Sequence, residues 1–152
     1  MSCFVCERLT EIRAGENPDL IIELESSYVV LGDFQFFRGY TLLLAKEHKE
    51  ELHELDSTQR TKFLAEMALV AEALYAVVQP AKMNYELLGN RVRHLHLHLF
   101  PRHADDPRPQ GPVFLIDEAV RNAESTRGTS EDRDQLKREI RAAIENIRMK
   151  RT

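Results

Sequence analysis

The chain has 152 residues, of which 43% are hydrophobic and 30% are charged, and its net charge at pH 7 is −4. The length suits one domain, and the composition is that of a folded globular protein. The negative charge argues against a nucleic-acid scaffold, which usually has a basic face. No apolar run approaches the roughly 18 residues of a membrane span, and the start, MSCFVCERL, lacks the apolar region of a signal peptide. We therefore expect a cytoplasmic protein without a nucleic-acid or membrane partner.

The first third of the chain predicts one helix followed by strands. Residues 4–13 predict a short helix, which ends before Gly15 and Pro18. Three apolar segments predict strands, and the first two form a hairpin by pattern. These segments are LIIELE (20–25), YVVLGD (28–33) and YTLLLA (40–45).

From Asp56 the apolar pattern changes to a helical period. The apolar residues that recur at this spacing are Phe63, Met67, Val70, Leu74 and Val77. Asp56 and Gln59 predict a capping pair at the start of this helix, and Pro80 limits its end.

The remainder of the chain predicts two strands and a last helix. The strands are MNYELLG (83–89) and LHLHLF (95–100), and the proline-rich residues 101–112 predict a loop. The last helix runs from about residue 131, and its apolar face is formed by Leu136, Ile140, Ile144 and Ile147. Strands flanked by helices, with a long helix between the third and fourth strands, indicate an α+β domain.

The segment RHLHLHLFPR (93–102) places His94, His96 and His98 in strict alternation with leucine. In a strand, such residues share one face and lie about 6.6 Å apart. One interpretation is a half-buried strand whose solvent face carries histidine. A second is a zinc site, although the outer pair lies about 13 Å apart, too far for joint ligation through bonds of about 2 Å. The third is a row of imidazoles that faces a phosphate chain, where one ring is a nucleophile and its neighbour a donor.

The same segment resembles the signature of the histidine-triad (HIT) family, His-φ-His-φ-His-φ-φ, where φ is apolar. CFVC near the start, GYTLLLAKEH (39–48) and MNYELLGNRV before the triad are similar as well. With Pro101 and Arg102 directly after the triad, the chain resembles the dinucleoside polyphosphate hydrolase branch of the family. The resemblance, from residue 3 to about residue 107, implies a single HIT-like domain with a mainly antiparallel five-stranded sheet, a long crossover helix and a C-terminal helix. We assign 1–112 to the HIT domain and 113–152 to an extension with one helix, packed on the same domain.

The resemblance implies a hydrolase that cleaves at the α-phosphate of dinucleoside polyphosphates or related nucleotide conjugates. It implies that His96 attacks the phosphorus and forms a nucleotidyl-histidine, while His98 contacts a phosphoryl oxygen and assists the leaving group. Asn90 is then a donor to the phosphate. Asp33 is the candidate ribose-binding acid, although a solvated turn residue fits its position equally well. Tyr40 occupies a position where many members have histidine, and a phenol supplies a hydrogen bond there but no cationic phosphate contact.

Cys3 and Cys6, the two cysteines of the chain, are too few for a disulfide framework. C-x-x-C indicates metal binding or redox chemistry, and a redox motif would follow a strand, which the first residues cannot supply. The resemblance implies a structural zinc held by Cys3, Cys6, His48 and His94, and it leaves open whether the substrate needs a divalent cation. The alternative is two reduced cysteines that pack as small apolar residues.

Other activities remain open at this point. The resemblance also accommodates a nucleotidyltransferase or phosphorylase, a nucleoside phosphoramidase, and a nucleotide-binding regulatory protein without catalysis. It further implies a homodimer whose sheets join along the strand 83–89.

Overall fold

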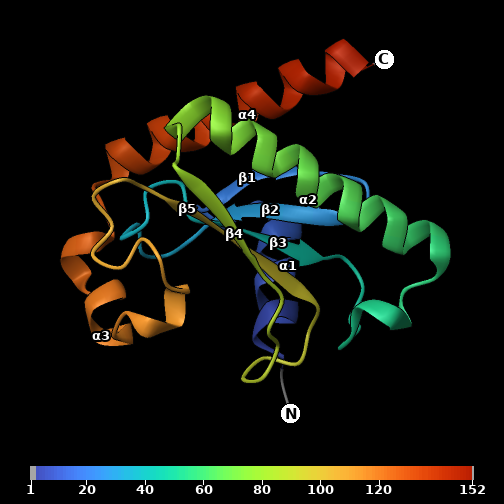
Figure 1. The fold of residues 1–152 in the computed structure, drawn as a ribbon. Helices are drawn as coiled ribbons and strands as arrows, with labels where there is room; N and C mark the ends of the chain where they lie inside the picture. The colour runs from blue at the N-terminus through green and yellow to red at the C-terminus, as the bar shows by residue number, and fades with distance from the viewer. Residues whose placement is uncertain (1–2, 152) are drawn as a thin grey trace.

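The computed structural model describes residues 3–151, which form an antiparallel five-stranded sheet with helices on both faces (Figure 1). The order of the strands in the sheet is β1-β2-β3-β5-β4. In chain order the elements are α1 (Phe4–Ala14), β1 (Leu20–Glu23), β2 (Ser27–Leu31), β3 (Thr41–Ala45), α2 (Ser57–Val78), β4 (Lys82–Glu86), β5 (His96–Arg102), α3 (Glu118–Arg121) and α4 (Ser130–Arg151). None of these helices is long and apolar enough to cross a membrane. The α+β class and the five-stranded antiparallel sheet are confirmed.

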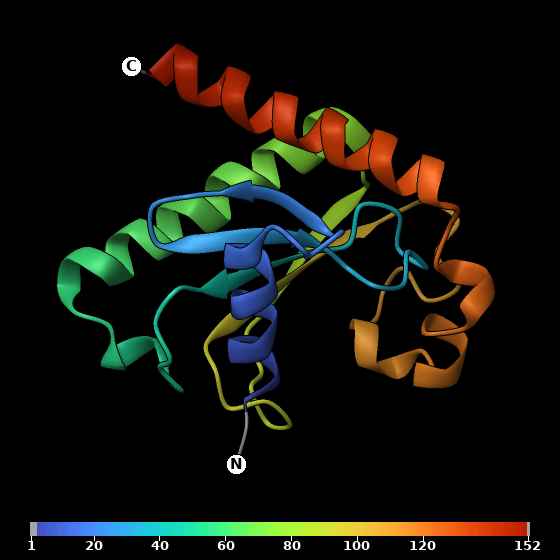
Figure 2. The ribbon, with the colours of Figure 1, turned by 180° about the vertical axis from the view of Figure 1, so that it is seen from behind.

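The two faces of the sheet are covered by different helices. Helices α2 and α4 lie together on one face, and α1 lies on the other (Figures 1 and 2). The main core contains Val29 and Leu31 from β2 with the apolar faces of α2 and α4, whereas Val30 packs with Leu9 of α1. This division follows from the alternation of side chains along a strand.

Strand β5 lies between β3 and β4, so its register is fixed from both sides. Leu97 and Leu99 are buried in the core beneath α2. The histidines of the triad must then point to the face that carries α1, because a shift of one residue would exchange the two sets. His96 is paired with Leu44, a residue of the α1 face, and His98 with Leu42.

A buried carboxylate ties helix α2 to the first hairpin. Glu66 is 8% exposed and accepts hydrogen bonds from the backbone N of Ser26 and from the hydroxyl groups of Ser26 and Ser27, at 2.6–2.8 Å. Both carboxylate oxygens accept a hydrogen bond, which offsets the cost of burying the charge. At the start of the same helix, the Asp56 side chain accepts from the backbone N of Gln59 at 2.8 Å, as the capping pair predicted.

The structure differs from the predicted elements at several points. The strand predicted over 83–89 ends at Glu86, and β5 continues through Pro101 and Arg102, which the sequence placed in a loop. Arg102 explains this extension, because its buried guanidinium bonds to Asp106 at 2.5 Å and to Asn84 of β4 at 2.6 Å. Beyond residue 112 the chain forms α3 and short 3-10 turns as well as α4. Elements of three or four residues have no periodic pattern, so the sequence did not indicate them.

Candidate active site and metal centre

The histidine face of β5 forms the floor of a cavity of about 490 Å³, lined by His96, His98, Tyr40 and Asn90 among others. One wall comes from residues after the sheet, including Phe114 and Arg121. A smaller hollow of about 250 Å³ shares His96 and His98 and extends towards α1 and Asp33. The structure therefore places His96 and His98 between two adjoining hollows, with Asn90 at the larger one and Asp33 at the smaller one.

The tautomer of His96 is fixed by the backbone carbonyl of His94. Its Nδ1 lies 2.6 Å from the carbonyl oxygen of His94. A carbonyl oxygen can only accept, so the hydrogen-bond network assigns the proton of the neutral ring to Nδ1. Nε2 then carries a free lone pair on a ring that lines the cavity. A fixed imidazole lone pair facing a cavity is suited to nucleophilic attack.

We assign the opposite tautomer to His98, with the Tyr40 hydroxyl as the donor. Its Nδ1 lies 2.7 Å from the hydroxyl oxygen of Tyr40. Burial lowers the pKa of His98 to about 4, with smaller contributions from the neighbouring His96 and from the positive charge of Arg121. Burial, and then Asp33, raise the pKa of Tyr40, so the phenol keeps its proton. A phenol that donates to Nδ1 leaves the proton of the neutral ring on Nε2.

The two rings therefore offer complementary groups side by side. Their centroids are 4.9 Å apart, and the rings are nearly perpendicular. His96 presents a lone pair and His98 presents an N–H donor, so one phosphate group can meet both. This pairing depends on two different hydrogen-bond partners, a carbonyl oxygen and a phenol.

Tyr40 is held in place by its neighbours. Its ring stacks on Phe100 with centroids 4.3 Å apart. Gly32 also approaches the ring, because a Cβ atom at this position would lie 2.1 Å from Cδ1 of Tyr40. Only glycine permits that approach, so the phenol position depends on the residue just after β2.

Asp33 and Asn90 reach the cavity from loops. Asp33 forms an ion pair with Arg8 of α1 at 2.5 Å, its side chain is 39% exposed, and it lines the smaller hollow. It is thus a paired carboxylate at the edge of the site and not a simple solvated turn residue. Asn90 is exposed, follows Gly89 with its φ of +82°, and lines the larger cavity.

His94, the first histidine of the triad, contacts the two cysteines instead of the cavity. It is 1% exposed, and its Nε2 lies 2.8 Å from the carbonyl oxygen of Ala45, so Nε2 carries the proton. Its Nδ1 faces Cys3 Sγ at 3.6 Å and Cys6 Sγ at 3.5 Å, and His48 Nδ1 lies 3.2 Å from Cys6 Sγ. One donor atom from each of these four residues lies within 4.8 Å of the others.

This cluster of Cys3, Cys6, His48 and His94 can hold a metal ion. Donors of a tetrahedral zinc site with bonds of about 2.0–2.3 Å lie about 3.3–3.8 Å apart. The three sulfur–nitrogen separations of 3.2–3.6 Å are close to this range, and all donor pairs lie within 4.8 Å. Burial also lowers the pKa of His94, which keeps its ring neutral, the form that binds a metal. The triad is thus divided, with one ring in the cluster and two in the cavity.

The sequence did not indicate every residue of the site. It indicated Tyr40 as a residue of the site, but not the hydrogen bond of Tyr40 to His98. It missed Arg8, the partner of Asp33, and Arg121, which reaches the cavity from α3. No local pattern marks these arginines, because each contacts the site only through the tertiary fold.

Comparisons with known proteins agree with this geometry. Residues 14–105 match the HIT domain family. Protein hit of Bacillus subtilis (strain 168) is 27% identical over 128 residues, which cover 72% of this chain and 86% of that protein. A histidine triad protein of Sinorhizobium meliloti 1021 has a similar crystal structure, with a TM-score of 0.74 and 25% identity, covering 90% of this chain and 93% of that chain. A zinc-bound histidine triad family protein of Mycobacterium smegmatis shares the fold, with a TM-score of 0.68 and 24% identity over 98% of this chain and 97% of that chain.

Proposed function

The chain belongs to the HIT family, and on that basis we propose that it is a nucleotide hydrolase with His96 as its nucleophile. Its substrates are dinucleoside polyphosphates or related nucleotide conjugates, cleaved at the α-phosphate. The observation that carries the proposal is the complementary pair of rings, a lone pair on His96 Nε2 beside an N–H on His98 Nε2. Nucleotide binding alone does not require an imidazole with a free lone pair.

The reaction has two steps. The lone pair of His96 Nε2 forms a bond to the α-phosphorus, and the bond from phosphorus to the leaving group breaks. Water then attacks the nucleotidyl-histidine, releases the mononucleotide and restores the free imidazole. His98 donates a hydrogen bond from Nε2 to a phosphoryl oxygen or to the leaving oxygen, where negative charge develops.

The neutral state of His98 favours one class of leaving group. With a pKa of about 4, His98 is not an imidazolium at pH 7 and cannot transfer a proton as a strong general acid. A phosphate or nucleotide leaving group departs as a stable anion, whereas an amine needs a proton to depart. This supports dinucleoside polyphosphates over phosphoramidates as substrates.

Two further residues bind the nucleotide in this proposal. Asn90 donates its amide N–H to the α-phosphate from the loop before the triad, and it lines the same cavity as both rings. Asp33 accepts from a ribose hydroxyl at the other end, in the smaller hollow. The Arg8 guanidinium 2.5 Å away orients the carboxylate for that contact.

The metal of the Cys3, Cys6, His48 and His94 cluster is zinc in this proposal, bound for structure. Two cysteines and two histidines are a donor set that suits zinc, and four protein donors leave no position for a substrate. Its chemistry is therefore to fix the start of α1 against β5. His94 then holds the backbone carbonyl that orients the His96 ring.

We also propose that the protein is a homodimer. Strand β4 lies at one end of the sheet, so one of its edges has no partner strand within residues 3–151. Tyr85 on this strand is 46% exposed, and Leu87 and Leu88 just after it are 37% and 58% exposed. An open edge beside apolar side chains favours pairing with a second copy across a two-fold axis.

Product analysis tests the proposed hydrolase. Purified protein is incubated in ¹⁸O-labelled water with diadenosine triphosphate or adenosine 5′-phosphoramidate, with and without inorganic phosphate. We expect labelled AMP and unlabelled ADP from the first substrate, and a product distribution that phosphate does not alter. His96→Asn should abolish turnover, while His53→Asn, which changes an exposed histidine outside the cavity, should retain it. Transfer of AMP to phosphate would instead identify a phosphorylase, and turnover by the His96→Asn variant would exclude the proposed nucleophile.

A further inference from the structure

The segment that follows the sheet forms one wall of the cavity, although it lies outside the matched residues 14–105. Val113 and Ile116 are buried and pack against Phe37 and Phe100. Phe100 belongs to β5, two residues after His98. Burial of these side chains holds the segment against the catalytic strand, so α3 has a fixed position at the cavity.

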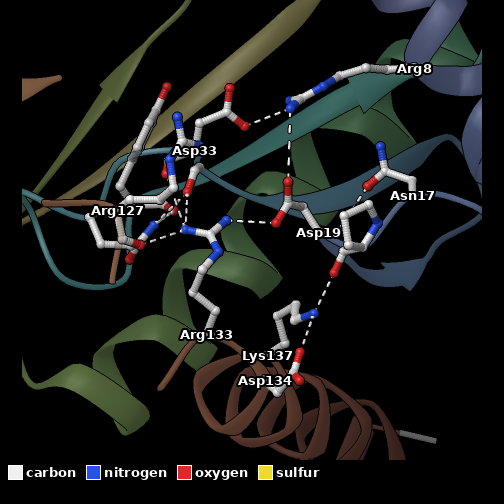
Figure 3. Close-up of polar contacts among 12 residues, drawn as sticks. Arg8, Asn17, Asp19, Asp33, Arg127, Arg133, Asp134 and Lys137 are labelled. Carbon is white, nitrogen blue, oxygen red and sulfur yellow. Dashed lines mark hydrogen bonds and ion pairs between the residues drawn. The ribbon is translucent and has the colours of Figure 1, made fainter. Parts of the chain in front are cut away.

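Further contacts join this segment to the loop that carries Asp33. The backbone N of Gln35 donates to the carbonyl oxygen of Thr126 at 2.7 Å, and Arg127 lies over the ring of Phe34 at 4.4 Å. Figure 3 shows Arg133 of α4 beneath the same loop, where its guanidinium reaches Asp19 and the carbonyl oxygen of Asp33. These contacts join the extension and the site into one rigid unit.

Arg121 differs from the other arginines at the site in having no ion pair with a carboxylate in the described part of the chain. Three arginines line the two hollows: Arg8, Arg91 and Arg121. Arg8 is paired with Asp33, and Arg91 forms two hydrogen bonds to Glu118 at 3.0 and 3.2 Å. Arg121 has no ion pair with a carboxylate within residues 3–151, where the one hydrogen bond of its guanidinium runs from Nε to the carbonyl oxygen of Ile116 at 3.0 Å. Both terminal nitrogens are left for a ligand.

The charge of Arg121 acts on the floor of the cavity. It contributes to the low pKa of His98 and opposes the burial that raises the pKa of Glu86. His98 and Tyr40 are neutral at pH 7, so neither supplies a positive charge to a bound polyphosphate. A guanidinium with two free N–H₂ groups matches the oxygens of a phosphate group.

From this geometry we infer that Arg121 binds the phosphate chain of the leaving group and makes the enzyme selective for leaving groups that carry phosphate. The inference rests on the proposed hydrolase function and adds the residue that sets its substrate class. The segment 113–122 is then a specificity element that the extension supplies to the HIT domain. The substrates it favours are nucleotides whose α-phosphate is linked to at least one further phosphate.

Two substrates with the same nucleotide but different leaving groups test this inference. Diadenosine triphosphate releases ADP, and adenosine 5′-(p-nitrophenyl) phosphate releases p-nitrophenolate, which needs no proton and carries no phosphate. Arg121→Gln should lower kcat/KM at least tenfold for the first substrate and less than about threefold for the second, since a charge-assisted contact is lost only with the first. Arg121→Lys should restore part of the loss. Arg91→Gln is the matched control, because it removes a cavity charge that Glu118 already pairs, and it should leave the ratio of the two values within about threefold.

Two readouts separate this inference from the proposed function and from a structural role. In a His96→Asn background, calorimetry compares the binding of AMP and diadenosine triphosphate, so the role of Arg121 is measured even if the wild type proves inactive. Arg121→Gln should weaken only the second ligand. It should also raise the pKa of His98 in an NMR titration, because a nearby positive charge is removed. Equal losses for both substrates or both ligands would overturn the inference. Failure of the wild type to hydrolyse either substrate would contradict the proposed function alone.

Discussion

Tyr40→Phe removes one hydroxyl group and tests how the two imidazoles acquire different tautomers. The hydroxyl is the hydrogen-bond partner of His98 Nδ1 at 2.7 Å. The ring should stay in place, since it stacks on Phe100 and rests against Gly32, and phenylalanine preserves both contacts. The change is therefore confined to the donor that fixes His98.

The size of the effect follows from the burial of this hydrogen bond. Loss of one neutral hydrogen bond costs about 0.5–1.5 kcal/mol, and a buried acceptor left without a partner costs about 1–3 kcal/mol. His98 can still turn or accept water at the cavity side, so we expect about 1–2 kcal/mol. The same amount lost in the transition state lowers kcat about 5- to 30-fold. The free energy of unfolding should fall by a similar amount.

Steady-state kinetics with diadenosine triphosphate measure the first effect, and ¹⁵N NMR of the imidazoles measures the tautomers directly. The wild type should show a protonated Nε2 on His98 and a protonated Nδ1 on His96. In Tyr40→Phe, the His98 signals should move towards a mixture of tautomers, while those of His96 should not change. An unchanged kcat together with an unchanged His98 tautomer would refute the reasoning.

Three other properties can be measured independently. The purified protein should carry about one zinc per chain, and both the Cys3→Ser, Cys6→Ser double variant and His94→Ala should lose it with part of the thermal stability. A wild type free of zinc after chelator-free purification would disprove the metal. The pKa of His98 is about 4, below the value of about 6.5 for an unfolded histidine. Between these two pH values the unfolded chain therefore binds a proton at His98 that the folded chain does not bind. Its contribution to stability is complete above about pH 6.5 and is lost as the pH falls towards 4, so the wild type should lose about 1 kcal/mol per pH unit relative to His98→Gln. A constant difference in chemical denaturation would contradict this pKa. Sedimentation should show a dimer of the 17.6 kDa chain, which Tyr85→Lys should convert to monomers, and a monomeric wild type at micromolar concentration would exclude the interface.

The parts of the fold that have a regular pattern could be predicted from the sequence. Alternation of leucine and histidine identified β5 and its two faces, and the recurrence of apolar residues at helical spacing identified α2 and α4. The strand boundaries were less accurate, because tertiary contacts decide them. Arg102 continues β5 past a proline through bonds to Asp106 and Asn84, and such bonds leave no signal in the adjacent residues.

The sequence indicated the residues that come together in the metal cluster and the triad residues that line the cavity, but neither the arginines beside them nor the electrostatics. The four residues of the metal cluster come together as the family resemblance implied. The division of the triad between the cluster and the cavity followed from the same resemblance. The tautomers could not be predicted, because they depend on which atoms lie near each nitrogen, such as the Tyr40 hydroxyl at His98. The position of Arg121 depends on a segment of irregular structure that is far from the triad in the sequence. No local pattern in that segment indicates that Arg121 lines the cavity.

The covalent intermediate is the most direct test of the central claim. Protein mixed briefly with diadenosine triphosphate is quenched in alkali, where a phosphorus–nitrogen bond to imidazole survives, then digested and measured by mass spectrometry. We expect an AMP adduct on His96 that forms and decays at rates compatible with turnover and is missing in His96→Asn. Turnover without any adduct, or an adduct on His98 or another residue, would exclude His96 as the nucleophile.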